Sequence, residues 1–274
     1  MKENNKISVV MSVYKGDRAK HFSKSVNSLL SQTHMPSEII IVVDGEVDEK
    51  VNLELKYFSK IKIISILRLK VNQGLSNALN VGIKKAKHNL IARMDADDIC
   101  FEDRFEKQMS FLVSKQLDFV GGQMVEFSKS IEDVISYRKV PVNHNQIVPF
   151  MKLRAPFSHP TILFKKEVFE RLKGYDTQIF PEDYDFFVRV YLNGFKMGNL
   201  EDNVLWFRLG EDLSAALKRR WGKKYAKNEY KLYKKFLKIG FYTKKDFLKA
   251  IIFKIPLRLI PFSIFKFLYF KILR

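Results

Sequence analysis

The chain of 274 residues can bury a substantial core, and its hydrophobic (46%) and charged (29%) fractions are ordinary for a globular protein, which excludes disorder as its main state. Its single cysteine, Cys100, excludes an internal disulfide framework and, with the polar start MKENNK, favours a reducing cytosol and no secretory signal. The net charge of +19 is concentrated in residues 215–274, which hold 18 Lys and Arg against two acids. This asymmetry indicates anionic partners such as nucleic acid, phospholipid or a phosphate-rich substrate.

Four apolar runs rich in β-branched residues predict buried strands in the first hundred residues. Segments with helical spacing lie between them, around 26–30, 53–58 and 75–86. This alternation predicts a parallel sheet, whose ligands bind beyond the carboxyl ends of the strands, where Asp44 and Asp95 fall. The predicted strands cover residues 7–13, 38–44, 61–67 and 89–94.

The middle of the chain predicts a less regular half. Residues 101–115 have the spacing of an amphipathic helix. Pro181 then precedes EDYDFFVRVYL, which predicts a helix beginning at Glu182, because proline and acidic residues favour helix starts. Further strands are predicted over residues 118–127, 134–140 and 161–164.

The last sixty residues change character. Residues 213–239 predict one long basic helix with a weak point at Gly222. Beyond Asp246, residues 250–274 are apolar and aromatic, but Lys254, Arg258, Lys266, Lys271 and two prolines interrupt them, so this segment is not expected to span a membrane. Its mixture of long cations and aromatic side chains suits a membrane interface, and the alternative is a tail packed on the body of the protein.

Asp95-Ala96-Asp97 places two carboxylates on one side of an extended loop after a strand. Such hard oxygen ligands can hold Mg²⁺ or Mn²⁺ and leave positions open for phosphates. An isolated pair of this kind is more often a surface loop whose acids cap the next helix. Asp44 and the polar turn KVNQGLSNALN (residues 70–80) converge on the same edge of the sheet and favour the metal site.

Glu182 and Asp183 form a second acidic pair, at the start of a predicted helix. They could cap the helix, since carboxylates there interact favourably with its dipole, or one of them could act as a general base. An aspartate at a helix start is expected to have a low pKa, which would make it a weak base. His159 precedes Pro160 at the entry to a strand, where a structural role is the more frequent one.

Seven segments follow one another along the chain: SVVMSVYKGD, IIIVVDG, NQGLSNALNVGI, IARMDADDICFEDRFEKQ, FSHPTILFKKEVF, GYD and PEDYDFFVRV. In this order they resemble the family-2 glycosyltransferases of the GT-A fold, and the likeness is strongest to the bacterial branch that builds capsule, exopolysaccharide and O-antigen, the amylovoran-biosynthesis type. The resemblance implies a Rossmann-like α/β fold, with a mostly parallel sheet flanked by helices. It implies a GT-A domain over 1–212, with a nucleotide-binding half (1–100) and an acceptor-binding half (101–212), and a basic amphipathic helical region over 213–274.

The resemblance also implies roles for single residues. Tyr14 would flank the uracil and Asp44 would hydrogen-bond the base. Asp95 would serve the ribose and the metal region, and Asp97 would ligate Mn²⁺ or Mg²⁺. Asp183 matches the catalytic base. Glu182 would lie beside it in the acceptor region. The residues expected to bind the nucleotide sugar are Tyr14, Asp44, Asn72, Gly74, Asp95, Arg208, Arg219 and Arg220.

The implied activity is metal-dependent, inverting transfer of a sugar from a nucleotide sugar, a UDP-hexose, to a hydroxyl of a lipid-linked oligosaccharide carried on undecaprenyl diphosphate. The enzyme would be cytoplasmic and peripheral at the inner face of the cytoplasmic membrane, held there by anionic lipid. The alternatives are a retaining or nucleotidyl-type enzyme on the same fold and, less favoured, a basic nucleic-acid-binding protein. No nucleic-acid-binding motif is present, so nucleic acid is not an expected partner.

Overall fold

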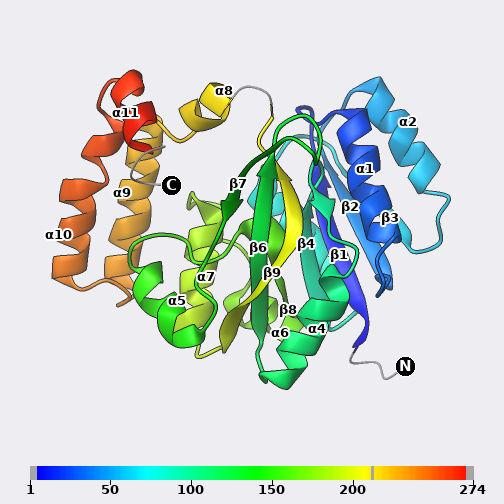
Figure 1. The fold of residues 1–274 in the computed structure, drawn as a ribbon, viewed down its shortest axis with the longest axis horizontal. Helices are drawn as coiled ribbons and strands as arrows, with labels where there is room; N and C mark the ends of the chain where they lie inside the picture. The colour runs from blue at the N-terminus through cyan, green and yellow to red at the C-terminus, as the bar shows by residue number, and fades with distance from the viewer. Residues whose placement is uncertain (1–4, 211–212, 270–274) are drawn as a thin grey trace.

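The computed structural model describes residues 5–210 and 213–269. It is a layered α/β fold in which helices cover both faces of one sheet (Figure 1). The strands are β1 (Ile7–Val13), β2 (Glu38–Asp44), β3 (Ile64–Leu69), β4 (Leu90–Asp95), β5 (Ile99–Cys100), β6 (Phe119–Phe127), β7 (Val134–Arg138), β8 (Leu163–Lys165) and β9 (Met197–Arg208). The α-helices are α1 (Ala19–Leu30), α2 (Glu49–Phe58), α3 (Leu75–Lys85), α4 (Arg104–Ser114), α5 (His144–Met151), α6 (Lys166–Leu172), α7 (Glu182–Leu192), α8 (Leu213–Lys218), α9 (Lys223–Lys238), α10 (Lys244–Phe253) and α11 (Phe262–Leu268).

The sheet has the order β3-β2-β1-β4-β8-β6-β9-β5, and β7 pairs with β6 outside this path. The pairs β2·β3, β1·β2, β1·β4 and β6·β9 are parallel. Strand β8 runs antiparallel to both of its neighbours, so β4 and β6 point the same way. The expected Rossmann-like, mostly parallel sheet is therefore confirmed.

The sheet separates two hydrophobic cores, because successive side chains of a strand point to opposite faces. In β1, Val9 and Met11 belong to the core beneath α1, α2 and α4, whereas Val10 belongs to the core beneath α3, α5, α6 and α7. Strands β1, β2 and β4 are buried on both faces, which explains their continuous runs of apolar residues.

The basic C-terminal helices pack on the body of the protein. Figure 1 shows α9, α10 and α11 grouped at the end of the molecule opposite α1 and α2. Phe236 of α9 and Ala250 of α10 belong to the same core as Phe187 of α7. Lys235 of α9 forms an ion pair of 2.5 Å with the fully buried carboxylate of Asp185 in α7. These helices therefore share the core of the sheet, while the domain boundary expected at residue 212 lies outside the described residues.

Two features differ from the sequence-based expectation. Residues 213–239 do not form one helix: Gly222 adopts a φ of +93°, and the chain is divided there into α8 and α9. Strand β9 and helices α5 and α6 were not predicted. None of the helices in the described part of the chain has the length and hydropathy needed to cross a bilayer.

Candidate active site

Three neighbouring parallel strands end at one edge of the sheet. In the register of β1 and β4, Ser12 lies beside Asp95, and in that of β1 and β2, Val13 lies beside Val43. Asp44 and Asp95, the last residues of β2 and β4, thus flank the end of β1. Ligands of parallel α/β sheets bind at such an edge.

Asp44 is buried (2% exposed) and holds the turn that precedes α3. Its carboxylate accepts hydrogen bonds from the backbone N–H groups of Gln73 (2.7 Å) and Gly74 (2.9 Å), and its carbonyl accepts one from the side chain of Asn72 (3.2 Å). Gly45 has a φ of +82°, and a Cβ there would lie 2.7 Å from the Asn72 nitrogen. The structure therefore groups Asp44, Asn72 and Gly74, and a contact of Asp44 with a base remains a prediction.

Tyr14 follows β1 and is 46% exposed. Its backbone N–H donates to the Asp17 carboxylate (2.8 Å). Burial and the charge of Asp17 raise the pKa of Tyr14, whereas Arg219 lowers it, so Arg219 lies on this side of the site. Burial raises the pKa of Asp17 to about 7, and the charges of Asp97 and Asp95 raise it too. Asp17 is thus a further acid of the cluster.

Asp95 forms an ion pair with Arg93 of the same strand. The two Nη atoms of Arg93 donate to the two carboxylate oxygens of Asp95, with an Nη1–Oδ2 distance of 2.6 Å. The Arg93 side chain is 3% exposed and that of Asp95 is 29% exposed. Burial alone would lower the pKa of Arg93. The Asp95 carboxylate outweighs this effect, so that the pKa of Arg93 is raised. Asp95 is therefore held by a cation of the protein itself.

Asp97 and Asp98 lie in the loop between β4 and β5. Burial and the charge of Asp95 raise the pKa of Asp97 to about 6, and burial raises the pKa of Asp98 well above its usual value. The backbone N–H of Arg208 donates to Oδ1 of Asp98 (2.8 Å), and the Arg208 Nε donates to the carbonyl of Asp97 (2.9 Å). Arg208 is the last residue of β9, and its guanidinium holds this acidic loop in place.

One carboxylate oxygen of this acidic loop is left without a hydrogen bond to any described residue. Oδ2 of Asp98 is buried and has no hydrogen-bond partner within the described residues. Within that part of the chain, no group of three or more His, Cys, Asp or Glu side chains is arranged to hold a metal ion by itself. Mg²⁺ and Mn²⁺ at nucleotide sites characteristically take one or two carboxylates and complete their coordination with phosphates and water. Asp97, with Asp95 beside it, fits a cation held in that way.

Glu182 and Asp183 begin α7. Burial raises the pKa of Glu182 to about 7, and the like charge of Asp183 adds to this rise. Burial also raises the pKa of Asp183, although the backbone N–H of Tyr184 donates to its carboxylate (2.7 Å). The low pKa expected for an aspartate at a helix start is therefore wrong here, because lost hydration outweighs the helix N–H groups. A raised pKa suits a general base.

Two arginines lie beside Asp183. The charges of Arg138, from β7, and Arg220, between α8 and α9, both lower its pKa against the effect of burial. Burial and the charge of Arg220 lower the pKa of Arg138 to about 10, so Arg138 remains a cation at neutral pH. Nη1 of Arg220 donates to the hydroxyl of Tyr269 in the last described turn (3.2 Å). Arg219 and Arg220 are thus adjacent in sequence, but the charge of the first acts on Tyr14 and that of the second on Asp183.

The two acidic groups face a common cation. Arg93 lowers the pKa of Asp97 at the sheet edge and of Glu182 and Asp183 on α7. The charge of Asp95 in turn raises the pKa of Glu182. The site therefore brings one acidic pair, able to hold a cation, close to another with a raised pKa.

His159 stays outside this chemistry. It is buried (8% exposed), and its Nε2 lies 2.9 Å from the hydroxyl of Tyr175. Burial and the charge of Arg93 lower its pKa well below the usual value, so the ring is neutral. This agrees with a structural role.

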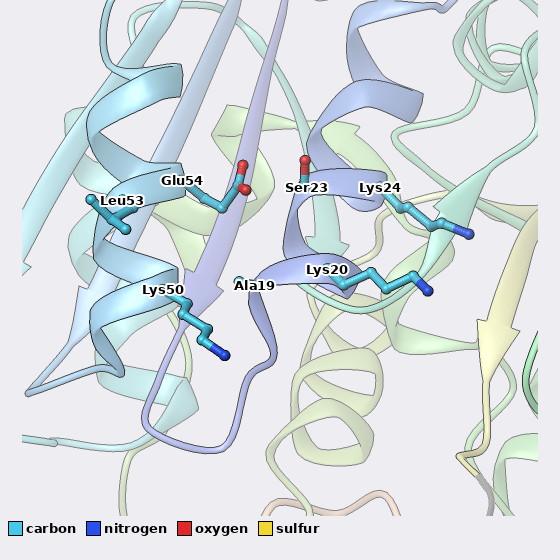
Figure 2. A pocket seen from close by; sticks show the side chains of 7 residues that line it. All are labelled: Ala19, Lys20, Ser23, Lys24, Lys50, Leu53 and Glu54. Atoms are coloured by element: carbon cyan, nitrogen blue, oxygen red, sulfur yellow. The ribbon is translucent and has the colours of Figure 1, made fainter.

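A shallow hollow of about 590 Å³ lies between α1 and α2 (Figure 2). Lys20 and Lys24 of α1 and Lys50 of α2 extend from its walls. It contains none of the acids described above. The candidate site therefore rests on the carboxylates at the sheet edge and not on this hollow.

Sequence reasoning missed three charged residues of the site: Asp17, Arg93 and Arg138. Arg93 carried a readable signal, since it is a cation inside an apolar strand, two positions before Asp95 and therefore on the same side of that strand. Asp17 and Arg138 carried none, because tertiary packing buries them beside acids distant in sequence.

The chain matches the family model described as Glycosyl transferase family 2 over residues 8–172. It belongs to this family. The family-2 chain is 31% identical over 268 residues to the amylovoran biosynthesis glycosyltransferase AmsE of Erwinia amylovora (96% of this chain, 98% of the relative). It is 32% identical over 270 residues to the UDP-Gal:alpha-D-GlcNAc-diphosphoundecaprenol beta-1,3-galactosyltransferase of Escherichia coli (98% and 97%).

The fold of this family-2 chain is shared with solved glycosyltransferases. The mannosyltransferase PcManGT of Pyrobaculum calidifontis, in complex with GDP-Man and Mn²⁺, superposes with a TM-score of 0.67 at 14% identity, covering 97% of this chain and 75% of that one. The expected family, its bacterial polysaccharide branch, the GT-A fold and the enzyme class are confirmed. The chain is a glycosyltransferase.

Proposed function

We propose that this glycosyltransferase transfers a hexose from a nucleotide sugar, a UDP-hexose, to a hydroxyl of a lipid-linked polysaccharide repeat unit, with inversion at the anomeric carbon. The observation that carries this proposal is the arrangement around Arg93, which pairs with Asp95 at the sheet edge while its charge reaches Glu182 and Asp183. Asp95 and Asp97 are suited to hold a cation beside the leaving diphosphate. Glu182 and Asp183 are suited to accept the proton of the attacking hydroxyl.

The donor lies along the ends of β1, β2 and β4. Tyr14 and the turn held by Asp44 bind the nucleoside, with Asn72 and Gly74 lining that turn. Asp97, with Asp95 beside it, would hold Mn²⁺ or Mg²⁺. The bound ion supplies the positive charge that stabilises the departing diphosphate. Arg219, on the Tyr14 side, and Arg208, which fixes the backbone of Asp97, add positive charge near the same group.

The acceptor hydroxyl is deprotonated by Asp183. The charges of Arg138, Arg220 and Arg93 lower the pKa of its carboxylate against the larger effect of burial, which raises it. As the hydroxyl oxygen attacks the anomeric carbon, its proton passes to Asp183 and the bond to the diphosphate breaks on the opposite face. Glu182 lies beside the base on the acceptor side.

The acceptor is an oligosaccharide on a polyprenyl diphosphate at the inner face of the cytoplasmic membrane. The similarity over nearly the full chain to the Escherichia coli galactosyltransferase, whose name gives a diphosphoundecaprenol acceptor, supports this class. The +16 charge of residues 215–274 also suits an anionic lipid surface.

The test is a panel of UDP-, GDP- and dTDP-sugars with Mn²⁺ and a lipid-linked acceptor, with product stereochemistry read by NMR. Asp183→Asn should lower kcat by about 10²–10⁴ while donor binding is kept. The control is Asp202→Asn, a surface acid paired with Lys107. Near-native turnover of Asp183→Asn would remove it from the role of base, and a retained anomeric configuration would favour the alternative retaining enzyme.

A further inference from the structure

Helix α10 has an exposed face that combines apolar and basic side chains. Leu248, Ile252 and Phe253 are 58%, 53% and 68% exposed, and they share this face with Lys245 and Lys249 at helical spacing. Exposed side chains of this size gain nothing from folding. The opposite side of the helix packs on the core through Phe247, Ala250 and Ile251.

The exposed apolar character continues into the next two helical turns. Leu259 is 53% exposed, and Ile264 and Phe267 of α11 are 50% and 62% exposed. Six large apolar side chains are thus exposed within 20 consecutive residues. A concentration of this kind marks an interaction surface, whereas single exposed apolar residues are ordinary.

The charge of this segment identifies what could cover it. Asp246 is the sole acid after Glu229, and its carboxylate is engaged by Lys152 (2.7 Å) and by the hydroxyl of Thr243 (2.8 Å). Within the described part of this segment, the exposed cations therefore have no unengaged acid to neutralise them. A second copy of the chain would bring the same positive charge and be repelled, whereas an anionic lipid surface would be attracted.

We propose that this docking face, the outward side chains of α10, the turn around Leu259 and α11, seats the enzyme on an anionic lipid bilayer. The apolar side chains enter the boundary between headgroups and acyl chains, and the lysines keep their ammonium groups among the phosphates. The helices are short and lie in the interface without crossing it. This inference deepens the proposed function: the purpose of the bilayer contact, bringing the site to a lipid-linked acceptor, rests on that function.

The docking face is joined to the acceptor side of the site. The ring N–H of Trp221 donates to the carbonyl of Ile260, just before α11 (2.8 Å). The neighbouring Arg220 donates to Tyr269, after α11, and its charge acts on Asp183. Seating α11 on a bilayer therefore places the side of the site with the expected base near the lipid surface.

The test uses the full chain and vesicles of equimolar phosphatidylglycerol and phosphatidylcholine, with vesicles of phosphatidylcholine alone as the lipid control. Cosedimentation is compared for the double variant Ile252→Asp/Phe253→Asp and for a matched one on α2, Leu53→Asp/Tyr57→Asp. The replaced side chains of α2 are similarly exposed, at 61% and 63%, and both variants change the net charge equally. Circular dichroism verifies that both fold.

We expect the wild-type chain to bind the anionic vesicles and to be released by salt. The α10 variant should lose at least about tenfold in partition coefficient, because two large apolar side chains no longer leave water, and the α2 variant should stay within about twofold. Equal loss in both variants, or none in the α10 variant, would overturn the proposal. So would a dimer in sedimentation velocity that the α10 variant alone dissociates while vesicle binding persists. Since the assay contains neither donor nor metal, its failure is distinct from a failure of the proposed transfer, which nucleotide binding measures on the same preparations.

Discussion

Arg93 donates to both carboxylate oxygens of Asp95 from two positions earlier on the same strand. The pair lies at the end of β4, with the Arg93 side chain almost fully buried. Arg93 also lowers the pKa of Asp97, Asp98 and Asp183. A cluster of acids that would otherwise repel one another is thus organised around one buried cation.

Replacing Arg93 should therefore destabilise the fold. Arg93→Met leaves the acids without their common cation and should lower the free energy of unfolding by about 3–5 kcal/mol, the cost typical of breaking a buried ion pair on one side. Urea unfolding measures this. The double variant Arg93→Met/Asp95→Asn should recover part of the loss, and Arg68→Met, on the surface of β3 at the far edge of the sheet, should change stability by less than about 0.5 kcal/mol. An Arg93→Met chain as stable as wild type would contradict the role given to this cation.

The acidic loop should make the metal-free protein less stable as pH rises. An acid whose pKa is higher in the folded than in the unfolded chain binds more protons when folded, so its stabilising effect is present at low pH and is lost between the two pKa values. For Asp97 these are the usual 3.8 and about 6. Asp97→Asn should raise the metal-free Tm by about 2–6 °C near pH 7.5, and by less near pH 5.

Differential scanning fluorimetry at the two pH values tests this, with Asp202→Asn as the control that should match wild type at both. Added Mn²⁺ should raise the Tm of wild type at the higher pH and leave Asp97→Asn unchanged. If the effect of Asp97→Asn on Tm were the same at both pH values, the pKa of Asp97 would not be raised in the folded protein, and the prediction would be wrong.

The pH dependence of turnover should follow the acidic pair on α7. Activity requires an ionised base, so it should fall as pH decreases through the raised pKa values of Asp183 and Glu182, the latter about 7. Glu182→Gln removes the like charge beside Asp183 and should move the acidic limb of the kcat/KM profile to lower pH. A limb that stays in place would mean that another group controls it.

The ion pair between Lys235 and Asp185 should contribute to the attachment of α9. Lys235 also contacts Asp176 (2.7 Å), and Asp185 receives a second cation, Arg189 (2.7 Å). Lys235→Met leaves the buried carboxylate with one partner and should cost about 1–3 kcal/mol in urea unfolding. Lys231→Met, an exposed lysine of the same helix, should be nearly neutral. Equal effects would mean that Asp185 needs only Arg189.

Local sequence patterns correctly predicted the elements that have a strong signal of their own, such as an apolar run or a clear helix start. The bounds of β1, β2 and α7 agree with the prediction to the residue, because the two strands are nearly continuous apolar runs and the helix begins after a proline with three acids in its first turn. Strand β9 was missed because Glu201 and Asp202 interrupt its apolar pattern, and its pairing with β6 contains register shifts. Long-range pairing of this kind has no local signal.

The candidate site was predictable to the extent that it lies at strand ends. Asp44, Asp95 and Asp97 could be placed at one sheet edge from topology alone. The pKa of Asp183 could not, since the helix start lowers it and only burial, a property of the whole fold, reverses the direction. The different surroundings of Arg219 and Arg220 could not be predicted either. They depend on the turn before Gly222, and the sequence predicted one continuous helix there.

Calorimetric titration of UDP, GDP and dTDP with and without Mn²⁺ tests the central claim most directly. At least one of these nucleotides should bind wild type and Asp202→Asn in the presence of Mn²⁺, and its affinity should fall by at least about tenfold without metal or in Asp97→Asn, because the carboxylate then no longer links the cation to the diphosphate. Binding of equal affinity in wild type and Asp97→Asn, with or without Mn²⁺, would contradict the account.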